Sequence, residues 1–146
     1  MINITWKRFW ISFVAGFILT SQLNYGAAIF VLNPIVTPMF DGFMKVGDAS
    51  ATLENIMRMT LGFMAPVFVS TYFIAALSKP VAWLPRTLLV GTMVSLSSFF
   101  GVYTFIAGWG NVKLDPLMIV ALCDWITLTT GMLLAGFIQD YKRSEA

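Results

Sequence analysis

The sequence predicts an all-α integral membrane protein, an antiparallel bundle of four transmembrane helices with both termini in the cytoplasm. Three observations support this fold class: the composition, four long apolar stretches and the distribution of basic residues. Of the 146 residues, 58% are hydrophobic and only 11% are charged, and the mean hydropathy is +0.81. About a quarter of an average soluble chain is charged. We therefore expect residues 1–146 to form a single domain within a lipid bilayer.

Four stretches are long enough to cross the hydrocarbon core, which takes about 20 mostly apolar residues in a helix. The first ends near Asn33-Pro34, the third closes at Gly110-Asn111, and the fourth begins after Asp115-Pro116. Strands of a membrane barrel would alternate polar and apolar residues, and runs such as 63–68 and 88–94 do not. We therefore predict transmembrane helices at 9–32, 56–77, 87–109 and 117–138.

The basic residues give the orientation. Cytoplasmic loops of membrane proteins carry an excess of Lys and Arg. With the N-terminus inside, six basic residues are cytoplasmic and three are external, which favours this arrangement in a plasma membrane of bacterial type. The cytoplasmic residues are Lys7, Arg8, Lys79, Arg86, Lys142 and Arg143, and the external ones are Lys45, Arg58 and Lys113.

The external loop, about residues 35–55, carries Phe40, Phe43 and Met44 at helical spacing. A short amphipathic helix of this kind can lie on the lipid headgroups. The alternative is a docking patch for a partner protein.

Polar side chains gather near the middle of the first span, where Gln22 and Asn24 lie. Small and polar residues also recur at every fourth position, and such residues let membrane helices approach closely. We expect this stripe to be a helix-packing surface, with a polar substrate path as the alternative. Its members are Ser12, Gly16, Thr20, Asn24 and Ala28.

Asp124 is the only acidic residue well inside a predicted span. A carboxylate at the centre of a membrane helix costs about 2.5–3.5 kcal/mol on insertion scales, so it needs a partner or a proton. Arg58 lies at comparable depth in the second span, and we expect an Asp124–Arg58 ion pair, although Glu54 is also one turn from Arg58. The pair is either structural or part of a proton- or cation-linked site with Asn24 and Gln22.

The sequence carries no recognisable catalytic centre. It has no histidine, which removes the commonest general base and the commonest ligand of haem, zinc and copper. No glycine-rich nucleotide loop is present, and Cys123 in an apolar stretch is expected to fill space. We therefore predict no enzyme activity, no cofactor and no metal site, while binding of a pigment, quinone or lipid stays open.

Several residues are arranged as in a known group of proteins. Gly16 in the first span is followed by Tyr25-Gly26, and Trp125 in the fourth by Gly131 and Gly136. This layout resembles a family of uncharacterised four-span bacterial membrane proteins. Asn24 stands where that family has an aromatic residue, and the family's proline and later tryptophan are missing. The resemblance covers most of the chain and implies a fold rather than an activity.

The function expected from these features is non-enzymatic: a structural or accessory subunit that packs within a larger membrane protein assembly. The abundant apolar surface, including 13 Phe and nine Met, and the short connections favour it. The alternative is a small oligomeric transporter or channel that uses the polar midplane residues. Partners are then the bilayer and other membrane subunits, as a hetero- or homo-oligomer. The net charge of +2 gives no basis for nucleic-acid binding.

Overall fold

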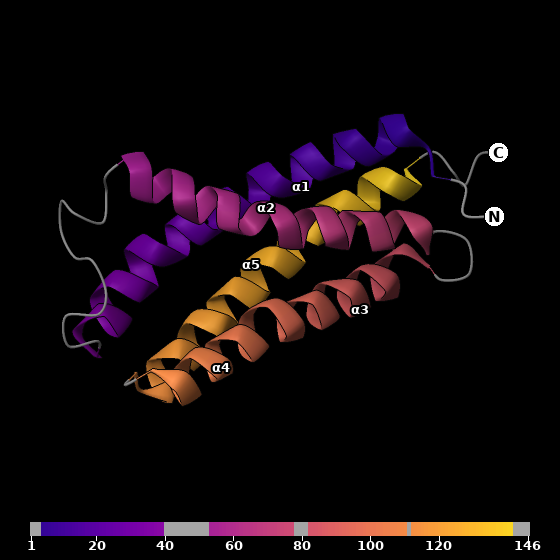
Figure 1. Cartoon of the computed structure of the whole chain (residues 1–146). Coiled ribbons are helices and arrows are strands. Elements are labelled where there is room, and N and C mark those ends of the chain that lie inside the picture. Colours follow the sequence, from indigo (N-terminus) through magenta and orange to yellow (C-terminus); the bar gives the residue numbers. More distant parts are fainter. Residues whose placement is uncertain (1–3, 40–52, 78–81, 111, 142–146) are drawn as a thin grey trace.

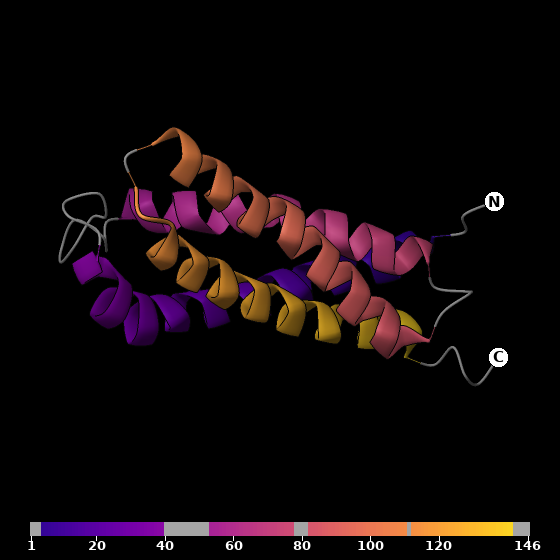
Figure 2. The ribbon, with the colours of Figure 1, turned by 90° about the horizontal axis from the view of Figure 1, so that it is seen from below.

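The computed structural model describes residues 4–39, 53–77, 82–110 and 112–141, and these residues are almost entirely helical. They form four helical rods that lie side by side (Figures 1 and 2). The first rod contains α1, Trp6–Ala27, and the second is α2, Leu53–Ala76. The third contains α3, Trp83–Ser95, and α4, Gly101–Trp109, and the fourth is α5, Leu114–Asp140. The prediction of an all-α fold is confirmed for these residues.

The first rod does not end at Asn33-Pro34, so that predicted boundary is wrong. After α1 the chain continues as a π-helix, η1, over Ala28–Val36, and then as a short 3₁₀ turn, η2, over Thr37–Met39. Pro34 lies inside η1. Proline lacks a backbone N–H, and local π-type adjustments let a membrane helix accommodate the missing hydrogen bond. The first rod is therefore longer than the apolar pattern indicates.

The third rod is a continuous helical run with a π-helical segment in its middle. Its pieces are α3, η4 over Leu96–Phe100 and α4, and it ends where Gly110 turns to extended backbone. The rod begins at Trp83, four residues before the predicted start at Thr87. Pro85 lies in the first turn, where a missing N–H removes no intrahelical bond. Proline at this position is thus compatible with the earlier start.

Three runs in the described residues are long and apolar enough to cross a membrane: Trp6–Val36, Trp83–Trp109 and Leu114–Asp140. They have 31, 27 and 27 residues, and about 20 suffice. In α2 the apolar helical part is shorter and covers Thr60–Ala76. Membrane-length helices are therefore present at three of the four predicted positions.

Helix α5 occupies the centre of the arrangement. It packs against α1, α2 and α3, while α1 also contacts α2, and α2 contacts α3. Figures 1 and 2 show successive rods running in opposite directions, so that the start of α1 and the end of α5 lie at one end of the molecule. We call this the Arg86 end, and the opposite one, where α4 and α5 are joined, the Trp109 end. From this central position Asp124 of α5 contacts both the first and the third rod.

The main apolar core lies between α2, the third rod and α5. Half-buried Phe13 and Phe17 of α1 pack against it, and a smaller cluster of Leu32, Val36 and Leu117 lies near the Trp109 end. Large apolar side chains also cover the outer surface of every rod. Such a surface suits hydrocarbon better than water. The members of the main core are Val67, Ile74, Val90, Val94, Phe99, Ala121, Leu128, Met132 and Ala135.

Candidate functional site

The small-residue stripe of α1 lies against α5. Gly16 faces Gly131, and a Cβ atom added at Gly131 would lie 2.8 Å from the backbone oxygen of Gly16. That oxygen cannot move without moving α1, so a glycine is required at 131 for this helix separation. We call this contact the α1–α5 seam. Four stripe members, Ser12, Gly16, Thr20 and Asn24, are buried, and Ala28 is half-buried.

A second close contact joins α5 to α3. A Cβ atom at Gly91 would lie 3.2 Å from the Cα of Thr129, and one at Gly136 would lie 3.3 Å from the Cβ of Thr87. The indole nitrogen of Trp125 also donates a hydrogen bond to Thr92 Oγ1 at 3.2 Å. Helix α5 therefore uses glycine and threonine on both sides to approach its neighbours closely.

At the Trp109 end of the α1–α5 seam, three polar side chains from three rods meet. Asn24 Nδ2 donates a hydrogen bond to Asp124 Oδ1 at 2.7 Å, and the hydroxyl of Tyr103 donates one to Asp124 Oδ2 at 2.7 Å. Asp124 is 3% exposed and Asn24 is 5% exposed. We call this group the Asp124 triad. Each carboxylate oxygen accepts a bond, so the carboxylate is satisfied by neutral donors.

The triad replaces the ion pair expected from the sequence, and Asp124 does not pair with Arg58. The Asp124 carboxylate is enclosed by α1, α4 and α5, whereas Arg58 is exposed on α2. Similar depth brought the two residues together in the prediction, but depth does not fix which way a helix face points. The rotation of α2 turns Arg58 outward.

Gln22 does not join the triad either. It is exposed on α1, while Asn24, two residues later, is buried. Successive helix residues are about 100° apart around the axis, so residues 22 and 24 face roughly opposite sides. The predicted polar group of Asp124, Arg58, Asn24 and Gln22 is thus separated, and only Asp124 and Asn24 meet.

The sequence reasoning missed Tyr103. It lies seven residues before Gly110, and Asp124 lies ten residues after Leu114, so both are roughly 10–15 Å from the same end of their helices at 1.5 Å per residue. A tyrosine at the same depth as Asp124, on the preceding and therefore antiparallel span, could have indicated this partner. Its hydroxyl can donate to a carboxylate without adding a charge to the membrane interior.

A second polar group lies at the Arg86 end and was also missed. The Arg86 guanidinium, fully buried, forms an ion pair with Asp140 at 2.9 Å and reaches the backbone oxygen of Leu77 at 3.5 Å. Arg8 donates to the backbone oxygen of Gln139 at 3.5 Å. Cations near a helix C-terminus interact favourably with its dipole. Arg86 and Arg8 therefore join the second, third and first rods to the end of α5.

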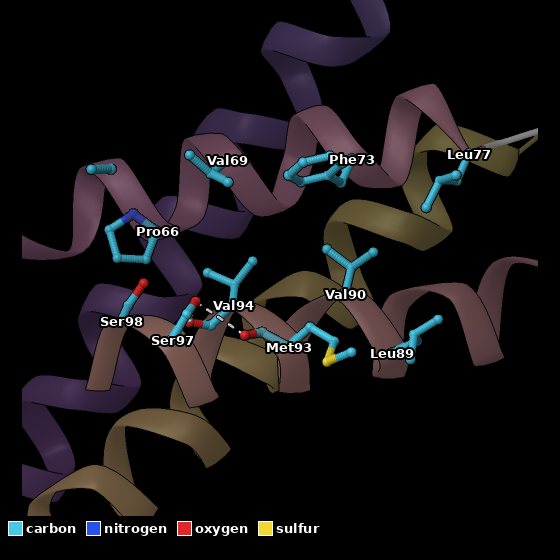
Figure 3. Close-up of a pocket in the computed structure, with 11 residues that line it drawn as sticks. Pro66, Val69, Phe73, Leu77, Leu89, Val90, Met93, Val94, Ser97 and Ser98 are labelled. Atoms are coloured by element: carbon cyan, nitrogen blue, oxygen red, sulfur yellow. Dashed lines mark hydrogen bonds between the residues drawn. The ribbon is translucent and has the colours of Figure 1, made fainter. Parts of the chain in front are cut away.

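An open groove runs between α2 and the third rod, with a volume of about 480 Å³. Figure 3 shows Pro66, Val69 and Phe73 of α2 on one side and Val90 and Met93 of α3 on the other. The hydroxyl of Ser97 bonds backward to the oxygens of Met93 and Val94, so it is satisfied within its own rod. The groove thus presents hydrocarbon almost throughout and carries no charged side chain.

Comparisons with protein-family models, with curated proteins and with solved structures find no match to this chain.

The Asp124 triad provides hydrogen bonds between helices. Among the described residues, no nucleophilic side chain is hydrogen-bonded to a base. Cys123 is half-buried and packs with the smaller apolar cluster near the Trp109 end. The predicted docking patch of Phe40, Phe43 and Met44 lies outside the described residues, so it stays a prediction.

Proposed function

We propose that this chain is a non-enzymatic structural or accessory subunit that crosses the membrane four times and packs within a larger membrane assembly. The observation that supports it is the closure of the Asp124 triad. Asn24 and Asp124 are buried, Tyr103 is half-buried, and their polar groups bond to one another across three rods. A chain that stabilises its own packing in this way needs no substrate to satisfy them.

The proposed topology places the Arg86 end in the cytoplasm of a bacterial-type cell. Arg8 and Arg86 lie at this end, close to the last turn of α5. Basic residues favour the cytoplasmic side. The same orientation places six of the nine basic residues of the chain in the cytoplasm and three outside. Four spans, with α2 as the second, return both ends of the chain to that side.

The second candidate function is a small transporter or channel, and one observation favours it. The hydroxyls of Ser12, Thr20, Ser70, Ser95 and Thr129 are buried and have no hydrogen-bond partner in the described residues. Water or an ion in a path could serve such groups. Against a path, Thr20 Oγ1 packs directly onto Gly131 and Thr129 packs onto Gly91, so these two hydroxyls fill helix contacts.

Purification after cross-linking in intact cells tests the assembly role. The chain, tagged at its C-terminus, is cross-linked before lysis, extracted in mild detergent and analysed by native electrophoresis and mass spectrometry. A subunit is expected to migrate in one defined complex with other membrane proteins at fixed stoichiometry across detergents. Recovery as this chain alone in every detergent would contradict the accessory role. An unrelated four-span protein at matched expression is the control for non-specific capture.

A further inference from the structure

Helix α1 carries a second ordered face, on the side away from the seam. Ile11, Ala15, Ile18, Gln22 and Tyr25 of α1 follow one another at spacings of four and three residues, and Ile29, at the start of η1, continues the series. The four large apolar members are between 44% and 55% exposed, and Gln22 is exposed as well. Residues at alternating spacings of four and three line one face of a helix, and helices that pair along a left-handed seam use a face of this kind. We call these six residues the Gln22 face.

The other rods leave this face uncovered. Contacts of α1 with α5 include Gly16, Thr20 and Asn24. Its contact with α2 includes the rings of Phe9 and Phe13 against Phe68, with centroids 5.4 and 5.6 Å apart. These residues lie on the opposite side of the helix. The Gln22 face therefore points away from the described parts of the fold.

Gln22 is out of place on a surface that meets only lipid. It lies 16 residues after Trp6 in the 31-residue run Trp6–Val36, which is close to the middle of the span. Its amide makes no hydrogen bond to any described residue. A side-chain amide without a partner in hydrocarbon costs free energy, and glutamine at such a depth commonly bonds to another helix. The apolar side chains of this face could be covered by lipid alone, whereas the Gln22 amide needs a hydrogen-bond partner.

We propose that the Gln22 face pairs with the same face of a second copy of this chain. A carboxamide has both donor and acceptor atoms, so two Gln22 side chains can each donate to the other across a two-fold axis. Two copies inserted in the same direction place their α1 helices parallel, which puts residue 22 opposite residue 22 at equal depth. A single polar residue in an otherwise apolar seam also fixes its register. The surface that covers the Gln22 face is thus the Gln22 face of the second copy.

This inference goes beyond the assembly role. It needs the first rod to cross a membrane, but it does not need a different subunit. A chain can form the proposed homodimer and still be bound by other proteins, or be bound by other proteins and form no homodimer.

Disulfide cross-linking in native membranes tests the pairing directly. In a Cys123→Ala background, single cysteines are introduced as Ile18→Cys and Tyr25→Cys, which leave Gln22 intact. Met93→Cys is the matched control, since Met93 is 61% exposed on α3. With a membrane-permeable oxidant, the variants at 18 and 25 are expected to form covalent dimers and the control is not. Equal dimer yields at all three positions, or none at 18 and 25, would overturn the proposal.

Affinity measurements test the role of the amide. Energy transfer between labelled copies in liposomes of increasing lipid-to-protein ratio gives the dimer dissociation constant. Gln22→Leu is expected to raise this constant roughly 8- to 300-fold, because the dimer loses two inter-helix hydrogen bonds of the strength measured in membranes. Thr104→Leu, an exposed polar residue on α4, is expected to leave it unchanged. An unchanged constant for Gln22→Leu, or cross-links from residue 18 only to a different protein, would refute self-pairing and leave the assembly role standing.

Discussion

The Asp124 triad gives the sharpest test of the packing account. Asn24→Ala removes one of the two donors to the carboxylate, and Asp124→Ala removes the acceptor that both donors share. Inter-helix hydrogen bonds in membrane proteins average about 0.6 kcal/mol and reach about 1.7. Bonds to a charged acceptor are the stronger ones, and both bonds here measure 2.7 Å. We therefore expect a coupling of about 1–2 kcal/mol between Asn24 and Asp124.

A double-mutant cycle measures this coupling. The wild type, both single variants and the double variant are unfolded by increasing SDS in mixed micelles, followed by tryptophan fluorescence and circular dichroism. The loss of unfolding free energy in the double variant is expected to be smaller than the sum of the two single losses, because neither partner is then left unpaired. The same cycle on Arg58 and Asp124 is the control and should be additive within about 0.5 kcal/mol.

Either of two results would refute the bond between Asn24 and Asp124. Additive losses for Asn24 and Asp124 would show that the two side chains do not share a bond. A coupling for Arg58 and Asp124 larger than that for Asn24 and Asp124 would restore the ion pair and refute the triad.

Three further predictions concern the α1–α5 seam, the Arg86–Asp140 pair and the topology. Gly131→Ala is expected to destabilise the fold by about 1–3 kcal/mol in SDS unfolding, because its Cβ would lie 2.8 Å from the Gly16 backbone oxygen. Gly62→Ala is the control and should not destabilise the fold, since open space surrounds Gly62. Equal losses in the two variants would contradict the seam. Arg86→Ala is expected to lower the unfolding free energy by about 3 kcal/mol, the low end for a broken buried pair, since Asp140 is 22% exposed. The double variant Arg86→Met with Asp140→Leu should lose less. Equal stability of the two variants would argue against the pair. Topology reporters after Ala146 and within residues 78–86 should signal cytoplasm, and one near Lys45 should signal the exterior; a periplasmic C-terminus would remove one span.

The helical class could be predicted from the sequence because a bilayer restricts the backbone so strongly. Each spanning segment must satisfy its own backbone groups and be about 20 apolar residues long. Composition and length alone therefore identified the three rods of membrane length. The end of the first rod could not be read in the same way, because Asn33-Pro34 resembles a helix terminus and the π-helical continuation leaves no signal in hydropathy.

The partners of Asp124 show where a single sequence stops. The pattern gives the depth of each residue but not the rotation of its helix. Arg58 and Asp124 were matched by depth, and the rotation of α2 separates them. The opposite orientation of Gln22 and Asn24 could have been predicted, since helix residues two positions apart in the sequence point about 200° apart around the axis. The Arg86–Asp140 pair was harder, because basic residues near span ends were taken as topological charges only.

Ion flux in proteoliposomes distinguishes a chain in which Asn24, Tyr103 and Asp124 bond to one another from a chain in which these side chains line a path. Purified chain at a defined protein-to-lipid ratio is assayed for proton, Na⁺ and K⁺ flux with pH- and potential-sensitive dyes. Vesicles containing Asp124→Asn are assayed alongside. The account predicts fluxes equal to those of protein-free vesicles for both proteins. A saturable flux in the wild type that Asp124→Asn abolishes would contradict the account and establish the transporter instead.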